Sequence, residues 1–333
     1  MIDELDLRLL HALQLAPRLS WSRLQDVLEV DASTLSRRWK RLRSEGLAWV
    51  FMHPSDQWSR ELFAYVEVDC QPGTRASVAD AVAPDPPAWS VEFTTGRREL
   101  VVAVGARTIR DLDRYVERRI AATPGVVSVR THVVRKTYRD QSMWRLNALT
   151  IHQQRVLTAE SESSDSPFAE PTAFDSQLLR ALACDGRRSA SSIAAELDRS
   201  ESTVTRGIAR MLGSLKGHMR CDMAQTIAGW PYVATLLISV PQNLMVSVAR
   251  GLAAMPTTRG CYSIAGPSNL LCVLWMRSLD ELDTVEERIG QHWPEARIDD
   301  RWLVTHFSKR MGHLLNDSGR RTHCVVPEFA VTE

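Results

Sequence analysis

Five cationic side chains lie close together in a chain whose overall charge is almost zero. The 333 residues carry a formal charge of +1 at pH 7, and no acid stands between Asp31 and Glu45. Surface helices usually mix both signs of charge, because opposite charges four residues apart stabilise them. A helix with one sign of charge repels itself unless a polyanion lies against it. This segment therefore indicates a polyanion-binding face, with a solvated surface helix as the alternative. The cations are Arg37, Arg38, Lys40, Arg41 and Arg43.

The cations belong to an amphipathic helix that follows two others. At about 100° per residue, Leu35, Trp39 and Leu42 share one side, opposite the cations and hydroxyls. Apolar spacing also predicts helices over 3–13 and 21–29, and 47–52 has the composition of a strand. Three short helices with a tight turn before the last form a helix-turn-helix, whose third helix fits the DNA major groove. The strand would be its wing. The expected caps are Ser20 and Asp31 at helix starts and Gly46 at the end of the third helix.

Position on the third helix predicts how each side chain would meet DNA. An arginine that points into the groove can bond guanine O6 and N7. Side chains nearer the helix edges are better placed for phosphates, which orient the protein without specifying sequence. Arg38 lies nearer the apolar side and is interpreted as a snorkelling or helix-pairing residue rather than a base reader, with Trp39 in the core. The candidates for base edges are Ser33, Ser36, Arg37 and Lys40, and those for phosphates are Ser20, Thr34 and Arg41.

The chain repeats this pattern in its second half. Residues 5–13 match 174–182, and 32–37 match 201–206, at one constant offset with no gap between the two matches. Such a repeat predicts a second helix-turn-helix. It retains two of the five cations, so the first copy is expected to supply most of the DNA affinity, and the second copy is either a weaker reader or a degenerate structural remnant. The lost cations are replaced by Gly207, Ala209 and Leu212, and the second set of DNA-binding candidates is Ser202, Thr203, Thr205, Arg206 and Arg210.

The rest of each copy also matches, at an offset one position longer, which places Gly96 over Gly266. Both regions run strand, helix, strand, strand, helix, strand, the order of a ferredoxin-like domain. The expected fold class is therefore α+β, with two tandem units, each a winged helix-turn-helix followed by a ferredoxin-like βαββαβ domain. The expected boundaries are 1–54 and 172–222 for the helix-turn-helix domains, 60–140 and 230–311 for the βαββαβ domains, 141–171 for a linker and 312–333 for a tail.

Composition argues against several other classes of protein. The chain has no run of apolar residues as long as the ~18 that a membrane-spanning helix needs, and its acidic start lacks the apolar segment of a secretory signal. The six cysteines show no CxxC, the nine histidines no HxxxH, and neither phosphate-binding nor hydrolase motifs occur. We therefore expect a cytoplasmic protein with reduced thiols, no metal, no cofactor, no catalytic residues and no membrane partner.

The segment LEVDASTLSRRWKRLRSEGL, residues 28–47, resembles the recognition-helix region of the leucine-responsive regulatory protein/asparagine-regulator (Lrp/AsnC) family of transcription factors. Residues 5–13 resemble the family's first helix, and the βαββαβ region with Gly96 in its hairpin resembles its ligand-sensing domain. The resemblance covers about 1–140 and again 172–310, whereas family members usually carry one unit. It implies a regulator that binds double-stranded DNA and a small-molecule effector, often an amino acid. Its sensing domains would pair through their sheets, here within one chain, and chains could assemble further.

By the same resemblance, the effector would bind near the hairpin glycines and the helix starts that follow. The family hairpin tends to hold an acid a few residues after its glycine, where this chain has Glu99 and Asn269, so the effector's identity does not carry over. Thr108 and Ser278 are also expected to cap the helices that follow them. The expected effector-binding residues are Gly96, Glu99, Thr108, Gly266, Asn269 and Ser278.

A haem-pathway enzyme is the alternative. Decarboxylases that act on sirohaem share the helix-turn-helix and sensing-domain architecture, and some are fused pairs. Such an enzyme needs cationic and histidine groups in its sensing-domain cleft to hold the tetrapyrrole carboxylates, but it needs no basic recognition helix. The basic face at 33–41 favours the regulator.

Overall fold

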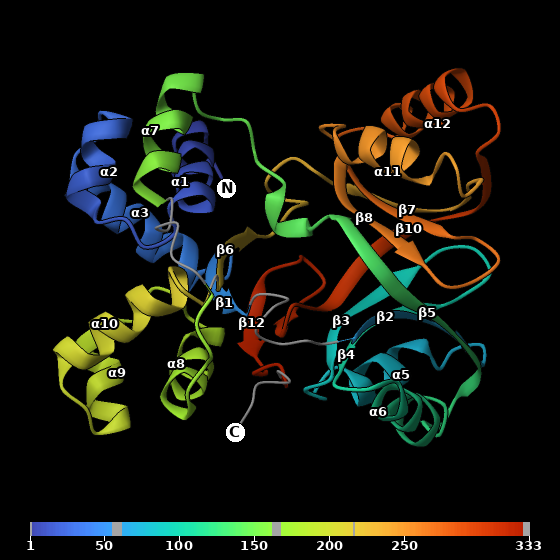
Figure 1. Ribbon diagram of the computed structural model, residues 1–333, viewed down its shortest axis with the longest axis horizontal. Coiled ribbons are helices and arrows are strands. Elements are labelled where there is room, and N and C mark those ends of the chain that lie inside the picture. The colour runs from blue at the N-terminus through green and yellow to red at the C-terminus, as the bar shows by residue number, and fades with distance from the viewer. Residues whose placement is uncertain (1, 55–61, 162–167, 216, 329–333) are drawn as a thin grey trace. The chain divides into compact units, whose positions relative to one another are not determined.

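The computed structural model describes residues 2–54, 62–161, 168–215 and 217–328, which form two compact units (Figure 1). The sequence predicts helix-turn-helix and βαββαβ domains in alternation along the chain. The structure instead places both helix-turn-helix domains in one compact unit and both βαββαβ regions in the other. The first unit takes the described residues of Met1–Glu61, Arg145–Ala224 and Arg320–Glu333, and the second takes Leu62–Trp144 and Gln225–Gly319.

The first unit contains two sets of three helices followed by a strand. The helices start at residues 4, 21 and 32 and again at 173, 190 and 201, so the offset of the sequence repeat holds for all three. The expected caps are present, since the Ser20 hydroxyl accepts from Arg23 N–H and the Asp31 carboxylate accepts from Ser33 and Thr34 N–H. The elements are α1 (Glu4–Leu15), α2 (Trp21–Leu28), α3 (Ala32–Ser44) and β1 (Ala48–His53), then α8 (Ala173–Ala183), α9 (Ala190–Leu197), α10 (Glu201–Leu212) and β6 (His218–Met223).

The two wing strands pair with each other. β1 and β6 are antiparallel, with Phe51 opposite Arg220, and these two residues are themselves counterparts in the sequence repeat. The second wing is a poorer strand by composition, yet every one of its residues pairs with one of the first. An exposed edge strand risks pairing with other chains, and this pairing covers one edge of each wing.

Gly46 follows α3, as the sequence predicts, and two constraints require a glycine there. Its φ of 66° lies in the left-handed region, which side chains rarely adopt. A Cβ at this position would also lie 2.3 Å from the Arg321 carbonyl oxygen. The C-terminal segment therefore runs directly over the end of α3, where Arg321 N–H donates to the Gly46 carbonyl.

Part of the expected linker is structural rather than a free connection. A short 3₁₀ turn, η2 (Gln141–Met143), leads to α7 (Ile151–Ser161), which contacts α1 and α2. The His11 ring accepts from the N–H groups of Ala148 and Leu149, and Gln153 donates to the Val27 carbonyl. From Arg145 to Ser161 the segment thus extends the first helical domain. Residues 162–167, in the acidic Ser/Pro stretch, lie outside the described residues.

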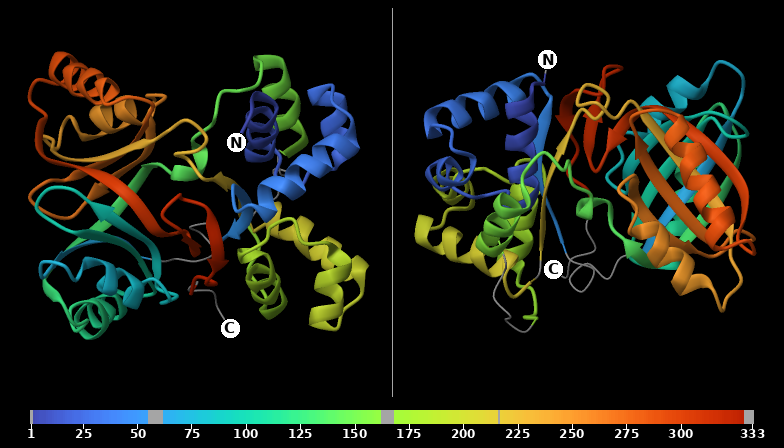
Figure 2. Two further views of the ribbon diagram at one scale, coloured as in Figure 1. Left: turned by 180° about the vertical axis from the view of Figure 1, so that it is seen from behind. Right: turned by 90° about the horizontal axis from the view of Figure 1, so that it is seen from above.

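The second unit is a closed sheet covered by helices on its outer face (Figure 2). Each half has the expected βαββαβ order and the strand neighbours β5-β2-β4-β3 or β10-β7-β9-β8. Two separate ferredoxin-like domains are the wrong description, however, because β5 pairs with β8 and β10 pairs with β3, which closes one eight-stranded barrel-like ring. The strands are β2 (Leu62–Cys70), β3 (Ala88–Thr94), β4 (Leu100–Ala106), β5 (Val126–Arg139), β7 (Tyr232–Ser239), β8 (Thr258–Ile264), β9 (Leu270–Met276) and β10 (Arg297–Arg310).

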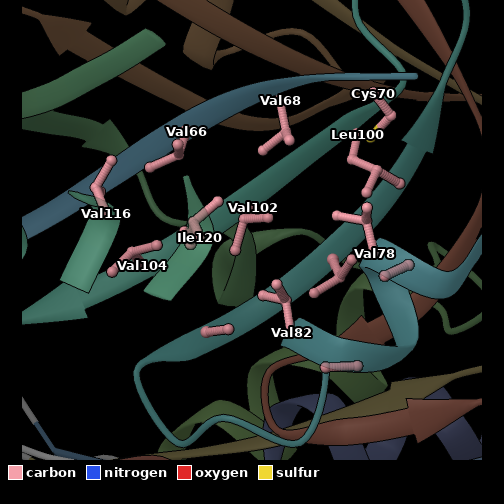
Figure 3. Close-up of a cluster of buried hydrophobic side chains, with 14 of the residues drawn as sticks. Val66, Val68, Cys70, Val78, Val82, Leu100, Val102, Val104, Val116 and Ile120 are labelled. Atoms are coloured by element: carbon pink, nitrogen blue, oxygen red, sulfur yellow. The ribbon is translucent and has the colours of Figure 1, made fainter. Parts of the chain in front are cut away.

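Alternating apolar residues pack the outer face of this sheet against its helices. Figure 3 shows Val66 and Val68 of β2 and Val102 of β4 facing Val78 and Val82 of α5. This alternation leaves every second side chain to the inner face. Thr108 caps α6 as expected, but α12 begins after Leu279 and has no side-chain cap, so the predicted Ser278 cap is wrong. The helices are α5 (Arg75–Val82), α6 (Ile109–Tyr115) with the π-helical turn η1 (Val116–Ile120), α11 (Met245–Ala253) and α12 (Asp280–His292).

The tail contains two short strands, β11 (His313–Leu315), which pairs with β10, and β12 (Arg321–Cys324). Cys324 forms a disulfide with Cys184, which ends α8. The expectation that all cysteines are reduced is wrong for this pair. The two are far apart in sequence, at a separation of 140, so only the fold brings their Cα atoms to 5.9 Å. The other four cysteines are free and buried.

We expect the Cys184–Cys324 bond to stabilise the first unit. It closes a long loop, and cross-links of this kind contribute about 2–4 kcal/mol by restricting the unfolded chain. Reduction should therefore lower the melting temperature of the wild type. The variant Cys184→Ser with Cys324→Ser should melt at the temperature of the reduced wild type and should not respond to reductant. A reductant effect of equal size in both proteins would contradict this assignment.

Candidate nucleic-acid interface

The exposed side of α3 presents three of the predicted base-reading side chains. Ser33, Arg37 and Lys40 are solvent-exposed, whereas Leu35, Trp39 and Leu42 are buried, so the predicted division of the helix is confirmed. Within the part of the chain that the structure describes, neither Arg37 nor Lys40 has an ion pair or hydrogen bond. Two cations are therefore available to a polyanion on this face.

The other three cations of the cluster are held by carboxylates. Arg38 contacts Asp3 at 2.6 Å and Asp6 at 3.0 Å, which confirms its predicted helix-pairing role. Arg41 also pairs with Asp6, whose side chain is fully buried, so this guanidinium fixes α3 to α1, and its contact to a phosphate stays a prediction. Since Arg43 lies 2.6 Å from Asp185, it is also neutralised.

The hydroxyls near α3 have structural partners. Ser33 Oγ donates to Asp31, and Ser20 Oγ caps α2. Thr34 and Ser36 are half-buried at the edges of the face. The cap uses a lone pair of the Ser20 oxygen, so the hydroxyl can still donate its O–H to a phosphate. The roles of all four toward DNA stay predictions.

The second recognition helix, α10, presents a similar but smaller face. Ser202, Thr205 and Arg206 are exposed, and Arg206 has no ion pair among the described residues. Thr203 is half-buried and shares a hydrogen bond with Ser200, and Thr205 Oγ1 donates to the Glu201 carbonyl.

Arg210 pairs with the buried Asp175, the counterpart of Asp6, and its contact to DNA likewise stays a prediction. By sequence, the cluster on α3 has five cations and its counterpart on α10 has two. When the cations that pair with carboxylates are left out, two remain on α3 and one on α10. The readers are less unequal than their composition indicates.

Four of the six expected effector residues lie at two equivalent hairpins of the second unit, whereas Thr108 and Ser278 follow the opposite ends of β4 and β9. Glu99 accepts from Cys70 N–H at 2.6 Å, and Asn269 exchanges two hydrogen bonds with the backbone of Val240. Glu99 and Asn269 are counterparts in the sequence repeat. Each side chain connects its hairpin by hydrogen bonds to the backbone at the end of a neighbouring strand. Gly96 has a φ of 92° and open space where a Cβ would be, Gly266 lies near His132, Thr108 is used as a cap, and Ser278 precedes α12.

A charged cluster lies beside the first hairpin and was not predicted from the sequence. Glu67 lies on the inner face of β2 with only 3% of its surface exposed, and it contacts Arg98, Arg130 and His132 at 3.0, 3.1 and 2.9 Å. Arg98 is equally buried, and it also pairs with Asp300 and lies 4.4 Å over the Trp302 ring. A usable signal was present, since Glu67 and Asp69 are polar on alternate positions of an otherwise apolar strand.

The surroundings of Glu67 hold it ionised. Burial alone would raise the pKa of its carboxyl, but the hydrogen bond from His132 and the charges of Arg98 and His132 outweigh it and lower the pKa from 4.5 to about 2. The opposite case is Glu92 on β3, where burial raises the pKa to about 8, against a smaller opposing effect of Arg310. Two inward carboxyls of one sheet therefore differ in charge at neutral pH.

Neutralising Asp6 should destabilise the protein, whereas neutralising Arg37 should not. Asp6→Ala leaves Arg38 and Arg41 without their buried partner, and loss of one side of such a pair costs about 2–4 kcal/mol. Arg37→Ala removes an exposed side chain and should stay within about 0.5 kcal/mol of the wild type. Urea unfolding of the two variants measures the difference, and Asp175→Ala should behave as Asp6→Ala does.

Acid should remove the stabilisation that Glu67 provides. Because its folded pKa lies below its unfolded value, the contribution is complete above about pH 4.5 and disappears as the pH falls toward 2. The shift corresponds to about 3 kcal/mol. Unfolding free energies measured from pH 6 to pH 2 should therefore fall more steeply for the wild type than for Glu67→Gln. Parallel curves would contradict the assignment.

In the described part of the chain, no helix is long and apolar enough to cross a membrane. No group of three or more histidine, cysteine or acidic side chains there is arranged to hold a metal ion.

The fold and surface together define a helix-turn-helix protein whose second unit is a paired βαββαβ sheet. Residues 2–43 match the AsnC-type helix-turn-helix domain, and residues 63–144 match the Lrp/AsnC ligand binding domain. The chain therefore carries both domains of Lrp/AsnC-type transcriptional regulators, as the sequence resemblance predicts.

Similar proteins agree at the level of these domains. An uncharacterised helix-turn-helix-type transcriptional regulator of Pyrococcus horikoshii is 26% identical over 135 residues, which is 40% of this chain and 85% of that protein. The regulator FL11 of the same organism is 25% identical over 141 residues, 42% of this chain and 93% of that protein. Each match spans a length of this chain that equals one helix-turn-helix domain plus one sensing domain.

A solved structure shares the fold over nearly the whole length. The siroheme decarboxylase NirDL, in complex with an iron-uroporphyrin III analogue, aligns with a TM-score of 0.60 over 93% of each chain. The two sequences are only 15% identical. The likeness therefore concerns the fold and assigns no chemistry to this chain.

Proposed function

We propose that this protein is a sequence-specific DNA-binding transcriptional regulator whose activity responds to a small molecule, an amino acid being the expected class. The exposed pair of Arg37 and Lys40 carries the proposal. Their neighbours Arg38 and Arg41 both pair with the buried Asp6, which fixes α3 to α1 and holds the two free cations on one rigid face. Preorganised cations on a helix face are what groove reading requires.

We further propose that the chain arose as two copies of one unit. The Asp6–Arg41 pair recurs as Asp175–Arg210 at the offset of the sequence repeat. The Glu99 contact recurs as the Asn269 contact at the equivalent hairpin. The β5–β8 and β10–β3 pairings supply within one chain the sheet contact that separate sensing domains would make between chains. Further assembly of chains remains part of the proposal.

The effector is proposed to bind in the second unit near the two hairpins. Gly96 leaves open space beside the first of them, and the ionic cluster of Glu67, Arg98 and Asp300 lies next to it. Groups of both charges in one place suit a zwitterion such as an amino acid. Glu99 and Asn269 would act there indirectly, by fixing the hairpins.

An enzyme acting on sirohaem is the second candidate, and the shared fold with a siroheme decarboxylase is the observation that favours it. Such an enzyme has no use for free cations on α3. An absorption titration with sirohaem separates the two functions, since a regulator should leave the tetrapyrrole spectrum unchanged and a decarboxylase of this type should bind it.

DNA binding should depend on the free cations and hardly at all on the paired ones. We expect Arg37→Ala with Lys40→Ala to weaken binding to the DNA upstream of the protein's own gene by about 100-fold, because each contact to a base or phosphate contributes about 1–3 kcal/mol. Arg206→Ala should weaken binding by less. Fluorescence anisotropy at several salt concentrations measures both the affinity and the salt slope.

Arg107→Ala with Arg110→Ala is the matched control, since it also removes two exposed cations, at and just before the start of α6 in the second unit. It should leave binding unchanged. Equal losses in the Arg37/Lys40 variant and the Arg107/Arg110 variant would mean that net charge, rather than a recognition face, governs the affinity.

A further inference from the structure

We infer that the protein reads an asymmetric DNA element made of two unlike half-sites, one under α3 and one under α10 of the same chain. The inference rests on the proposed function and specifies its target. It requires that the two helices be held as a symmetric pair, that both be intact as readers, and that their reading faces differ.

Reciprocal contacts hold the pair. Arg18 donates to the carbonyls of Gly186 and Arg188, and Arg187 donates to those of Pro17 and Leu19, with the second bond 3.1 Å long in each case. In the sequence repeat, Arg18 corresponds to Arg187, Gly186 to Pro17 and Arg188 to Leu19. A contact in which residue i meets j and j meets i is the mark of two-fold symmetry.

The wing strands obey the same symmetry, since Phe51 and Arg220 are counterparts in the repeat and lie opposite each other. Two-fold pairs of recognition helices meet two DNA half-sites of opposite direction. Dimers obtain this arrangement from two identical chains, so their half-sites are alike. Here one chain supplies both helices, and nothing requires the half-sites to match.

The second helix is intact as a reader. Ser200 caps its start, and the Arg210–Asp175 pair anchors its end as Arg41–Asp6 anchors α3. Gly207, which stands where α3 has Arg38, is a packing residue rather than a sign of decay. A Cβ there would lie 2.4 Å from a Leu178 methyl, so the glycine lets α10 approach α8 closely.

The two faces agree at some positions and differ at others. Both present a serine at the start of the helix, Ser33 and Ser202, and a free arginine one turn later, Arg37 and Arg206. They differ one turn further on, where α3 has the cation Lys40 and α10 has the exposed Ala209. Lysine bonds guanine O6 and N7, whereas alanine contacts the methyl group of thymine. The two half-sites should therefore share the arginine's base pair and differ at the neighbouring one.

Selection of binding sites from a random DNA pool, with the full-length protein, tests the inference. The wild type should enrich two half-sites in opposite directions that differ chiefly at one base pair, with guanine on the α3 side and thymine on the α10 side. Ala209→Lys should make the enriched site symmetric with guanine in both halves. Lys40→Ala should make it symmetric with thymine in both, and each variant should lose about tenfold in affinity for the wild-type site, as a single mismatched base contact does.

The outcomes are distinct. A palindromic site for the wild type, or a site with a single half, would overturn the inference while leaving DNA binding in place. No enrichment above random DNA would overturn both the inference and the proposed function. Arg110→Ala should select the wild-type site, and melting curves of all variants show that each is folded.

Discussion

A buried carboxylate at the same place in two helices decides which cations of this protein are free. Asp6 and Asp175 are almost wholly buried, and each binds an arginine of the recognition helix that crosses it. Removing a charge from water is costly unless it is paired, so these arginines stay where the acids hold them. The result is a fixed orientation for each recognition helix and an exposed face that contains only the cations without such a partner. The rest of the proposed DNA-binding surface depends on this arrangement.

Symmetry inside a single chain is the second organising feature. In the first unit, the Arg18 and Arg187 contacts and the β1–β6 pairing relate one helical domain to the other. In the second unit, the β5–β8 and β10–β3 pairings close one ring from two βαββαβ halves. A homodimer must keep both halves of such a contact identical. A fused pair can vary each half separately, as the differences between Lys40 and Ala209 and between Glu99 and Asn269 illustrate.

The closed sheet also explains why charged residues occupy the interior of the second unit. A strand that is covered by helices on one face and turned toward the ring on the other buries both sets of side chains. Glu67 stays ionised there because it pairs with Arg98 and with further charged neighbours. Glu92, with a single weaker charge influence, is held neutral instead. Polar groups at such positions give a sheet specific internal contacts next to the hairpins that the effector is proposed to use.

The sequence by itself determined the elements that depend on local patterns. The periodicity of Leu35, Trp39 and Leu42 sets the buried side of α3, Ser20 and Asp31 start their helices, and the constant offset between the two copies predicts the second set of helices. These features depend on neighbours close in the chain, and a linear sequence records such neighbours. Only the tertiary structure decided the rest. It revealed that Arg41 and Arg43 are paired, that the wings join, that the two sheets form one ring, and that Cys184 meets Cys324. Each of these contacts joins residues far apart in the chain, and whether a side chain is free or paired depends on what the fold places opposite it.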